Sequence, residues 1–390
     1  LVFDVFTGIS QSSQQSINSW PDKGFSQPTF NPLGGSATSL QQIQGQTNSP
    51  LPDPSPFGNA GWFIDPRFKN AYSHQWNVEI QHQFTDNLVL SAAYVGSRTR
   101  RTDNNGAANN AVTPGAGTPE EVNLRRPYPY QTTMFYSLSR GKAWYDSLQF
   151  KADRRFSNGL QFLISYTWSK SLDLGQSGWF TAEEGPGGSA SLQDFYHPEL
   201  SKSLSGYDVP HFLSISSVYE LPFGKGKPML NRGPAAWILG NWQTNVIAQF
   251  RSGQPYNISV SGDVANVGNA VGWWNYARPN LVGDPKISNP TSARWFNPDA
   301  FSVPVLSYGS FGRNVLRTDG VTNIDFSLFK NVPLGERVSV QFRAEAFNVF
   351  NIMSLGAPNG LLNQPTTGQV SSLAQGINPR QMQMGLKIVF

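Results

Sequence analysis

The chain has 390 residues and a formal net charge of +4, with 14% charged residues, 13% aromatic residues and no cysteine. The lack of cysteine excludes disulfides, thiolate catalysis and cysteine-ligated metals, and the small net charge argues against nucleic-acid binding. The longest apolar run, residues 235–239, is too short for a transmembrane helix. Few charges and many uncharged polar residues are typical of a protein with one lipid-facing side and one wet, neutral side.

Alternation of apolar and polar residues predicts strands along most of the chain. In the first clear segment, Trp76, Val78 and Ile80 share one face while polar residues take the other. Upstream, we expect a loop-rich segment over residues 1–69 with a first strand at 1–6. A barrel domain over 70–390 follows. Its predicted strands cover 75–84, 88–96, 147–156, 160–170, 213–222, 241–250, 323–332, 337–347 and 382–390.

The connections between these strands alternate in length. The turns at 85–87, 157–159 and 333–336 are short, that at 222–237 is moderate, and the connections at 99–143, 171–210, 252–322 and 351–377 are long. Outer-membrane barrels have short periplasmic turns and long extracellular loops. We therefore expect an all-β fold, an antiparallel transmembrane β-barrel with about nine or ten strands in this chain, in the bacterial outer membrane.

The chain ends on a strictly alternating strand, "MQMGLKIVF". Leu386, Ile388 and Phe390 share its apolar face. A terminus is expendable unless something holds it, and pairing in a barrel wall would hold it. This strand also looks like the C-terminal signal that bacterial outer-membrane proteins present to their assembly machinery. We therefore interpret Phe390, Ile388 and Leu386 as a barrel-assembly signal.

Seven stretches, in order, carry a resemblance to a known family. They include "AYSHQWNVEIQHQFTDNLVLSAAYVGSRTRR", "DSLQFKADRRFSNGLQFLISYTWSKSLD", "DVPHFLSISSVYELPFGKGK", "GNWQTNVIAQFRSGQPYNISV", "WFNPDAFSVP", "FGRNVLRTDGVTNIDFSLFKNVPLGERVSVQFRAEAFNVFN" and "NPRQMQMGLKIVF". Together they resemble the C-terminal barrel of TonB-dependent receptors, in particular the Oar-like group with a carboxypeptidase-regulatory-like domain. The resemblance runs from about residue 71 to the end.

This resemblance implies binding or uptake of an extracellular ligand. It also implies outer-membrane lipid, lipopolysaccharide and the barrel-assembly machinery as partners, together with a plug or N-terminal part or another subunit. Members of the family carry a plug, a TonB box and a 22-stranded wall, and these residues show neither plug nor box. The chain is then either the C-terminal part of a longer receptor or a shortened relative that closes alone with about ten strands.

Two loops contain candidate ligand-binding residues. Trp273, Trp274 and Tyr276 cluster beside Arg278 in the longest loop, and Glu183 and Glu184 lie in the loop at 171–210. Aromatic faces flanked by amides suit a sugar or peptide ligand, since stacking supplies area and amides supply direction. Packing of the aromatic residues over a barrel mouth, and an ordinary solvated acidic loop, explain the same residues.

Catalytic motifs are lacking. The four histidines are far apart in the sequence, so no metal-binding pair is recognisable, and "GQSGW" has Trp179 where a nucleophile elbow needs glycine. We expect no enzyme, no metal and no cofactor. The alternatives to a receptor are a non-transporting structural or adhesive surface protein that acts through its long loops, and a soluble secreted β-protein that binds polysaccharide.

Overall fold

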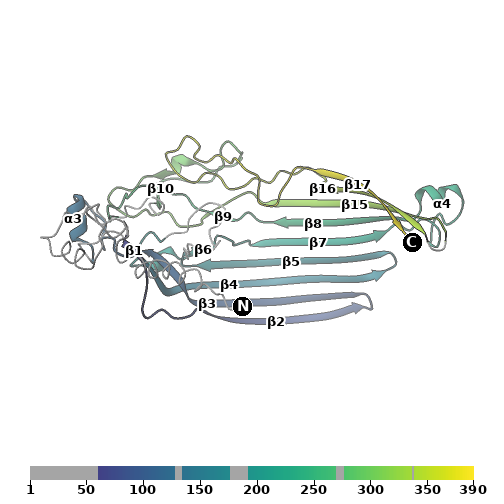
Figure 1. Cartoon of the computed structure of the whole chain (residues 1–390), viewed down its shortest axis with the longest axis horizontal. Helices are drawn as coiled ribbons and strands as arrows, with labels where there is room; N and C mark the ends of the chain where they lie inside the picture. Colours follow the sequence, from purple (N-terminus) through teal and green to yellow (C-terminus); the bar gives the residue numbers. More distant parts are fainter. Residues whose placement is uncertain (1–59, 128–133, 176–191, 269–275, 336–337) are drawn as a thin grey trace, which may run out of the picture.

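A single large antiparallel sheet dominates the computed structural model, which describes residues 60–127, 134–175, 192–268, 276–335 and 338–390. Nine long strands lie side by side in chain order, and Figure 1 shows them as one broad, curved wall. Their bounds are β2 Tyr72–Thr85, β3 Leu88–Ala107, β4 Met134–Ser157, β5 Leu160–Asp173, β7 His211–Glu220, β8 Trp242–Arg251, β15 Val321–Pro333, β16 Ser339–Phe347 and β17 Gln381–Val389. All nine strands predicted between residues 75 and 390 are confirmed. The segment at 1–6 lies outside the described residues.

The strand register separates the wall into two faces. One cross-strand row is apolar throughout: Leu90, Ala152, Ile164, Ile215, Ala248 and Ile324. The row one residue further along is polar throughout: Ser91, Lys151, Ser165, Ser214, Gln249 and Asn323. Because side chains alternate across a strand, the first row lies on one surface and the second on the other. We call these surfaces the apolar face and the polar face.

Among the described residues, many large apolar side chains on the apolar face are exposed rather than packed against other parts of the chain. Ile80 on β2 is 74% exposed and Met384 on β17 is 75% exposed. A soluble protein rarely leaves so large an apolar surface uncovered, whereas a membrane wall presents such a band to lipid. The face therefore has the character expected of a surface solvated by lipid.

The wall is open, with β2 at one edge and β17 at the other. Neighbouring long strands are antiparallel throughout, so the odd number of strands makes β2 and β17 run in the same direction. Antiparallel closure between these two edges needs an odd number of further strands. The expected alternatives of about ten strands or 22 strands both meet this condition and remain predictions.

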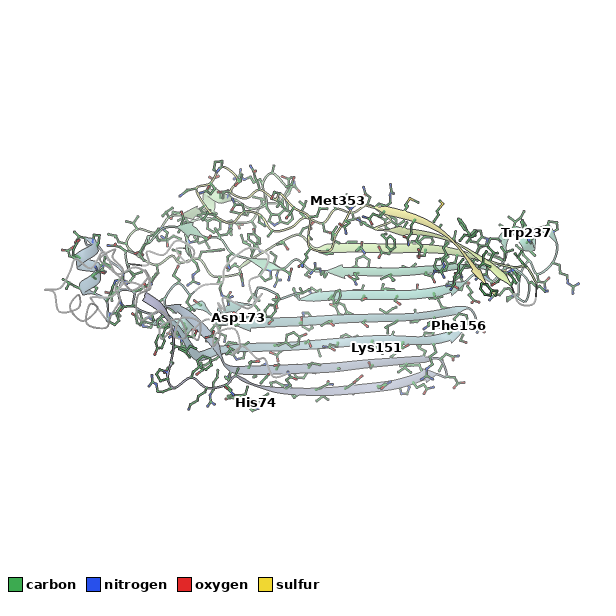
Figure 2. All side chains as sticks on the ribbon, viewed as in Figure 1. His74, Lys151, Phe156, Asp173, Trp237 and Met353 are labelled. Carbon is green, nitrogen blue, oxygen red and sulfur yellow. The ribbon has the colours of Figure 1, made fainter. Side chains whose placement is uncertain are left out.

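One end of the wall carries tight turns. Between β4 and β5, Asn158 and Gly159 adopt φ values of 52° and 80°. Two residues with positive φ form the hairpin turn whose twist matches that of the flanking strands, as "SNG" predicts. The β7–β8 connection at this end contains the short helix α4, Gly233–Leu239. Figure 2 shows Phe156 and Trp237 at this end, and Asp173 toward the opposite one.

The opposite end is a folded mass of long connections, which we call the loop cap: described residues 108–127, 192–209, 252–320 and 348–380 (Figure 1). It contains the helices α3 Pro119–Leu124, η2 Pro198–Ser201 and η3 Pro298–Ala300. Its short strands are β9 Pro255–Tyr256, β10 Val260–Ser261, β11 Tyr276–Ala277, β12 Asn280–Leu281, β13 Phe301–Ser302 and β14 Leu316–Arg317. Two further short strands, β1 Ala60–Ile64 and β6 Ser203–Leu204, pair with β4 and β5.

One expectation about the connections needs correction. Residues 99–143 were expected to be loop, yet β3 extends to Ala107 and β4 begins at Met134, so these strands rise well beyond the membrane-spanning length. Ladder hydrogen bonds between β3 and β4, with β1 alongside β4, support this extension. Among the described residues, no helix has the length and apolar character needed to span a membrane.

Candidate functional site

The loop cap has its own hydrophobic core. Tyr256 and Phe296 are each 1% exposed, and their rings lie 6.1 Å apart. Phe301 packs edge-on against both Phe296 and Phe311, with ring centroids 5.9 and 4.9 Å apart. Such aromatic contacts add to the free energy gained by burial. The cap is therefore a packed unit rather than a set of independent loops.

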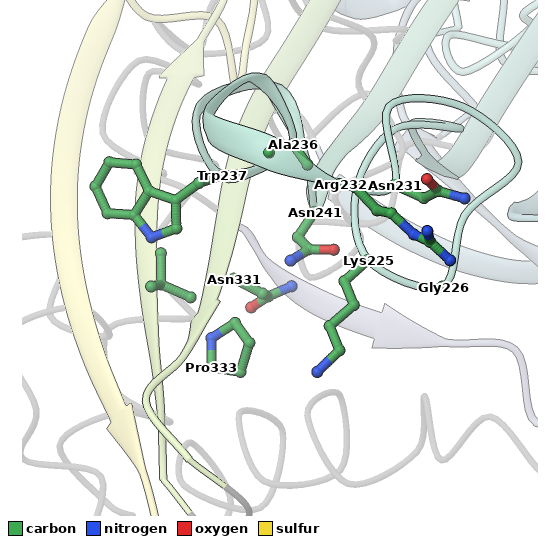
Figure 3. A pocket seen from close by; sticks show the side chains of 11 residues that line it. Lys225, Gly226, Asn231, Arg232, Ala236, Trp237, Asn241, Asn331 and Pro333 are labelled. Atoms are coloured by element: carbon green, nitrogen blue, oxygen red, sulfur yellow. The ribbon is translucent and has the colours of Figure 1, made fainter.

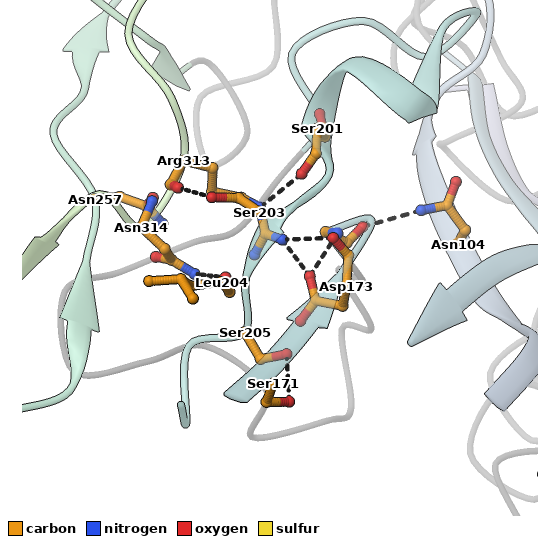
Figure 4. Close-up of polar contacts among 11 residues, drawn as sticks. Asn104, Ser171, Asp173, Ser201, Ser203, Leu204, Ser205, Asn257, Arg313 and Asn314 are labelled. Atoms are coloured by element: carbon orange, nitrogen blue, oxygen red, sulfur yellow. Dashed lines mark hydrogen bonds and ion pairs between the residues drawn. The ribbon is translucent and has the colours of Figure 1, made fainter. Parts of the chain in front are cut away.

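A buried ion pair joins this unit to the end of β5 (Figure 4). Arg313 in the cap pairs with the carboxylate of Asp173, and their side chains are only 3% and 8% exposed. The Arg313 guanidinium also donates to the backbone oxygens of Asp173 at 3.2 Å and Ser201 at 3.3 Å. Removal of one partner would leave the other charge buried without compensation, so the pair fixes the cap in place.

A second ion pair lies beside the first. Arg317 pairs with Asp208, whose carboxylate is 1% exposed, and it also donates to the Gly253 carbonyl at 2.9 Å. Asp208 in turn accepts the Ser171 amide at 2.5 Å. The Ser171 hydroxyl lies 2.9 Å from that of Ser205, as Figure 4 shows. Strand β5 and two cap segments, 192–209 and 252–320, are thus tied together at one place.

Arginines bound to carbonyls hold the far part of the cap. Arg126 donates to the carbonyls of Asn109 at 2.6 Å and Gly268 at 2.7 Å, and burial lowers the pKa of its guanidinium. Arg125 donates to the carbonyls of Gly115 at 3.1 Å and Asn266 at 2.9 Å. Both arginines directly follow the short helix α3, Pro119–Leu124, and join it to residues more than 140 positions away in the sequence.

Asp194 organises a titratable turn in the cap. Its carboxylate accepts the Tyr196 amide at 2.8 Å and lies 2.7 Å from Nδ1 of His197. This hydrogen bond and the carboxylate charge raise the pKa of His197. Burial, together with Asp194, raises the pKa of the Tyr196 phenol to about 12. The phenol therefore stays protonated and donates to the carbonyls of Ala108 and Asn110, at 2.9 and 2.8 Å.

The predicted ligand-binding residues fall mostly beyond the described part of the chain. Trp273, Trp274, Glu183 and Glu184 lie outside the described residues. The backbone of Tyr276 begins β11 and pairs with Ser261. Arg278 is half-buried in the cap, where its amide donates to Oε1 of Gln193 at 3.0 Å.

The guanidinium of Arg278 is partly buried in the cap. Burial, with the nearby charge of Arg313, lowers the pKa of its guanidinium to about 10. Its buried Nε has no hydrogen-bond partner among the described residues. An unpaired donor of this kind is costly unless a further group accepts from it. Of the predicted residues, Arg278 is thus the one whose side chain the structure places within the cap.

A cavity of about 690 Å³ lies where the polar face of the wall meets the cap. Neutral side chains line much of it, among them Ser97, Gln149 and Thr167 from β3, β4 and β5. Tyr145, Tyr207, Phe212 and Arg251 also line it. Sequence reasoning missed this site because its residues are single alternate positions on separate strands. Only the strand register brings them together.

A second cavity, of about 520 Å³, lies at the opposite end, beside α4 (Figure 3). Lys225, Arg232, Asn241 and Asn331 line it together with Trp237. Among the described residues, no group of three histidine, aspartate or glutamate side chains could hold a metal ion.

The geometry agrees with a comparison against known protein families. Residues 3–383 match the family model described as an outer membrane beta barrel domain, and the chain belongs to that family. It is a bacterial outer-membrane protein, and the all-β barrel fold and location expected from its sequence are confirmed. The apolar face is accordingly the lipid-facing side of the wall, the polar face is the inner side, and the loop cap is extracellular.

Solved structures with similar folds are outer-membrane transporters and receptors. The transporter YddB of Escherichia coli is 10% identical, with a TM-score of 0.43 over 85% of this chain and 34% of its own. For the ferric-catecholate import receptor Fiu of E. coli K12 the identity is 13% and the TM-score 0.38, over 83% of this chain and 28% of its own. For the FrpB iron transporter of Neisseria meningitidis the identity is 11% and the TM-score 0.39, over 84% of this chain and 32% of its own. No curated protein matches the chain.

The chain spans about a third of the length of these structures. The identities and TM-scores are too low to transfer a ligand from any of them. The family match shows an outer-membrane barrel domain, and any ligand must be argued from the residues themselves.

Proposed function

We propose that the chain forms the wall and extracellular cap of an outer-membrane receptor that binds or takes up an extracellular ligand. The observation that carries this proposal is the cavity of about 690 Å³ between the polar face and the cap. Its volume is that of a small-molecule site, and its lining of hydroxyl, amide and aromatic groups suits directional recognition.

The lining suggests the chemical class of the ligand. Serine, threonine and glutamine outnumber charged groups, while Tyr145 and Tyr207 offer ring faces. A neutral or weakly anionic sugar or peptide matches this combination, with Arg251 available to an anionic substituent. Trp273, Trp274, Tyr276 and Arg278 remain candidates for contacts with such a ligand. Glu183 and Glu184 remain candidates for its hydroxyl or amino groups.

A non-transporting structural or adhesive protein is the second candidate. The buried aromatic core of the cap favours it, because a packed extracellular unit suits recognition of a surface partner without transport. The two candidates differ in one property: a receptor moves its ligand across the membrane, whereas an adhesive protein holds it outside.

Binding and uptake can be measured separately. A panel of neutral oligosaccharides and short peptides is titrated against purified protein by calorimetry, and the best binder then enters a liposome-swelling assay. Tyr145→Ala with Arg251→Gln should weaken binding by about tenfold or more. Phe329→Ala, at the other end of the same face, is the control and should leave binding unchanged. Ligand binding without liposome swelling would favour the adhesive function. Equal ligand affinities of the double variant and the Phe329→Ala control would contradict the proposal that the ligand binds in this cavity.

We propose an Oar-like, TonB-dependent receptor as the finer class, with the described strands as its C-terminal part. Further strands, and a plug supplied by another part of the chain or another subunit, would complete it. The boundary between a loop-rich segment at 1–69 and a barrel domain at 70–390 stays part of this proposal. The apparent mass of the native protein, measured on a gel of an outer-membrane fraction, tests this proposal. A mass well above 100 kDa favours the larger receptor, and a mass near 43 kDa favours a small barrel.

The C-terminal strand is proposed to recruit the barrel-assembly machinery. Leu386 and Phe390 are 70% and 96% exposed, so they are accessible on the apolar face of an edge strand. Deletion of Phe390 should reduce the folded, heat-modifiable fraction in the outer membrane. Val305→Ala, in the exposed part of the cap, is the control. Normal assembly of the deletion variant would contradict the signal.

Lipopolysaccharide is proposed as the lipid partner at the extracellular rim. The cations of this rim are Arg98, Arg100, Arg101, Lys142, Lys170 and Lys202. Arg100 and Lys202 lie 5.3 and 4.4 Å from the ring of Trp144, which presents them toward the outer leaflet. Arg100→Gln with Lys202→Gln should reduce co-purified lipopolysaccharide, whereas Lys387→Gln on the polar face should not.

A further inference from the structure

The β7–β8 connection at the periplasmic end carries an exposed apolar helix. In α4, Trp237 is 71% exposed, Ile238 57% and Leu239 50%. Pro234, at the first turn, favours the start of this helix. Figure 1 shows α4 beyond the ends of the long strands, close to β15 and β17. Three consecutive large apolar side chains so exposed to solvent need a partner.

The wall holds this helix from its lipid-facing side. Nζ of Lys330 donates to the carbonyls of Trp237 and Ile238, each at 2.8 Å, and of Gly240 at 3.1 Å. The indole of Trp242 donates to the same Ile238 carbonyl at 3.0 Å. Lysine near a helix C-terminus both satisfies free carbonyls and complements the helix dipole.

The register shows on which side of the wall this contact is made. Lys330 pairs with Trp242 on β8 and with Phe342 on β16, and Phe342 pairs with Leu386 on β17. Lys330 lies two residues from Leu328, so both side chains point to the apolar face. The C-terminal end of α4 is therefore fixed against the lipid-facing surface at the periplasmic rim.

The backbone of the connection leaves little freedom for another arrangement. A Cβ at Gly240 would come within 2.2 Å of the Ala236 carbonyl oxygen and 2.5 Å of Cα of Gly224. Glycine thus permits the close approach that folds the connection back on itself. The Asn241 amide then donates to the Phe223 carbonyl at 3.0 Å.

The composition of the connection matches a membrane surface. Residues 221–241 contain Lys225, Lys227 and Arg232 and no acidic residue. Met229, exposed to 54%, adds a further apolar side chain. Cations next to an exposed apolar, tryptophan-containing helix are typical of segments that lie at the boundary of lipid headgroups and acyl chains.

We propose that residues 221–241 form a phospholipid-binding segment, with Trp237, Ile238 and Leu239 embedded in the periplasmic leaflet of the outer membrane. Lys225 and Arg232 contact lipid phosphates, and Lys330 positions the helix. The occupant is lipid rather than a periplasmic protein, because the exposed side chains continue the lipid-facing band through Trp242, Phe342 and Leu386.

The chain lacks cysteine, so single spin labels can be placed without background. Ile238→Cys is labelled with a nitroxide in protein reconstituted into phosphatidylethanolamine–phosphatidylglycerol vesicles. The ratio of oxygen to nickel-chelate collisions is then measured. Leu124→Cys, at an apolar residue of α3 in the cap that is 74% exposed, is the water-side control. Ile80→Cys on the apolar face is the lipid-side control.

We expect the ratio at position 238 to be several-fold higher than at 124 and close to that at 80. Adding Lys330→Met should bring it down toward the value at 124, while heat-modifiable migration reports that the wall is still folded. A ratio at 238 equal to that at 124 in the otherwise native protein would overturn the proposal. A lipid-like ratio unchanged by Lys330→Met would overturn the positioning role of Lys330.

Discussion

The wall and the loop cap differ in what surrounds their apolar side chains, which is lipid for the wall and other protein side chains for the cap. On the wall, protein leaves 74% of Ile80 exposed, and every residue of β2 is exposed. Lipid is what covers the apolar side chains of this region. In the cap, Tyr256 and Phe296 are 1% exposed and pack against other aromatic rings. The wall depends on the membrane for its stability, whereas the cap has the core of a small water-soluble domain.

Polar contacts follow the same division. In the wall, the backbone amides and carbonyls form ladder hydrogen bonds between long strands that follow one another along the chain. The cap depends instead on side chains that join distant segments. The pairs Asp173–Arg313 and Asp208–Arg317 connect residues 140 and 109 positions apart. Substitutions in the two regions should therefore fail in different ways, and the following predictions test that difference.

The largest effect should come from the buried ion pair. Arg313→Met leaves the carboxylate of Asp173 buried without its partner and should destabilise the cap by roughly 3–5 kcal/mol. Hydrogen exchange of the cap amides measures this loss, while heat-modifiable migration shows an intact wall. Arg294→Met is the matched control: its pair with Asp299 is largely exposed, so the cost should be below about 1 kcal/mol. Equal effects of the two variants would contradict the role assigned to the buried pair.

Truncation of a phenylalanine to alanine should lower the free energy of unfolding by different amounts in the cap and in the wall. Phe296→Ala leaves a cavity in the cap core and should cost roughly 3–5 kcal/mol. Phe150→Ala on the apolar face leaves space that lipid fills, so its cost should be about 1–2 kcal/mol. Urea titrations of protein folded in vesicles give both values. A larger loss at Phe150 would show that the wall, rather than the cap, has the tightly packed core.

A charge placed on the two faces of one strand should sharpen the comparison within the wall. On the central strand β7, Ile215→Lys puts an ammonium group in lipid and should destabilise the folded barrel by roughly 2–4 kcal/mol. Ser214→Lys, one residue away on the polar face, should change stability by less than about 0.5 kcal/mol. Folding titrations into vesicles compare the two variants, and equal costs would contradict the assignment of faces.

The smallest effect concerns pH and is confined to the cap. The pKa of His197 is raised by Asp194, so the folded cap binds the proton more tightly than the unfolded chain. This stabilisation is complete below the ordinary pKa of 6.5 and is lost as the pH rises through the raised value. Exchange protection of the Tyr196 amide should therefore fall above pH 6.5, after correction for intrinsic exchange. His197→Gln should abolish the change, whereas the wall amides should show none in either protein.

The sequence predicts the wall because its periodicity is local. Alternation along 160–170 or 323–332 reports the two faces directly, and hairpin residues such as Asn158 and Gly159 report the turns. The long extensions of β3 and β4 were not predicted, because their outer parts contain runs such as "RTRRTDNNGA" with no alternation. They exist because each strand pairs with the other.

The cap could not be predicted for a related reason. Its core residues have no period, and contacts such as Arg313 with Asp173 depend on the path of the whole chain. The cavity on the polar face is equally hidden from the sequence, because most of the strand positions that line it, such as Ser97, Tyr145 and Arg251, lie beyond the predicted strand bounds. Of the predicted ligand-binding residues, Arg278 is the one whose side chain the structure places, and its role in ligand binding stays a prediction.

The central claim is that the apolar face lies in lipid and the polar face in water. Single nitroxide labels at Leu148, Gln149, Phe150 and Lys151 on β4 test it most directly, again by oxygen and nickel-chelate collisions in vesicles. The account predicts alternation with a period of two, with positions 148 and 150 in lipid and 149 and 151 in water. Uniform water exposure at all four positions would contradict a membrane wall.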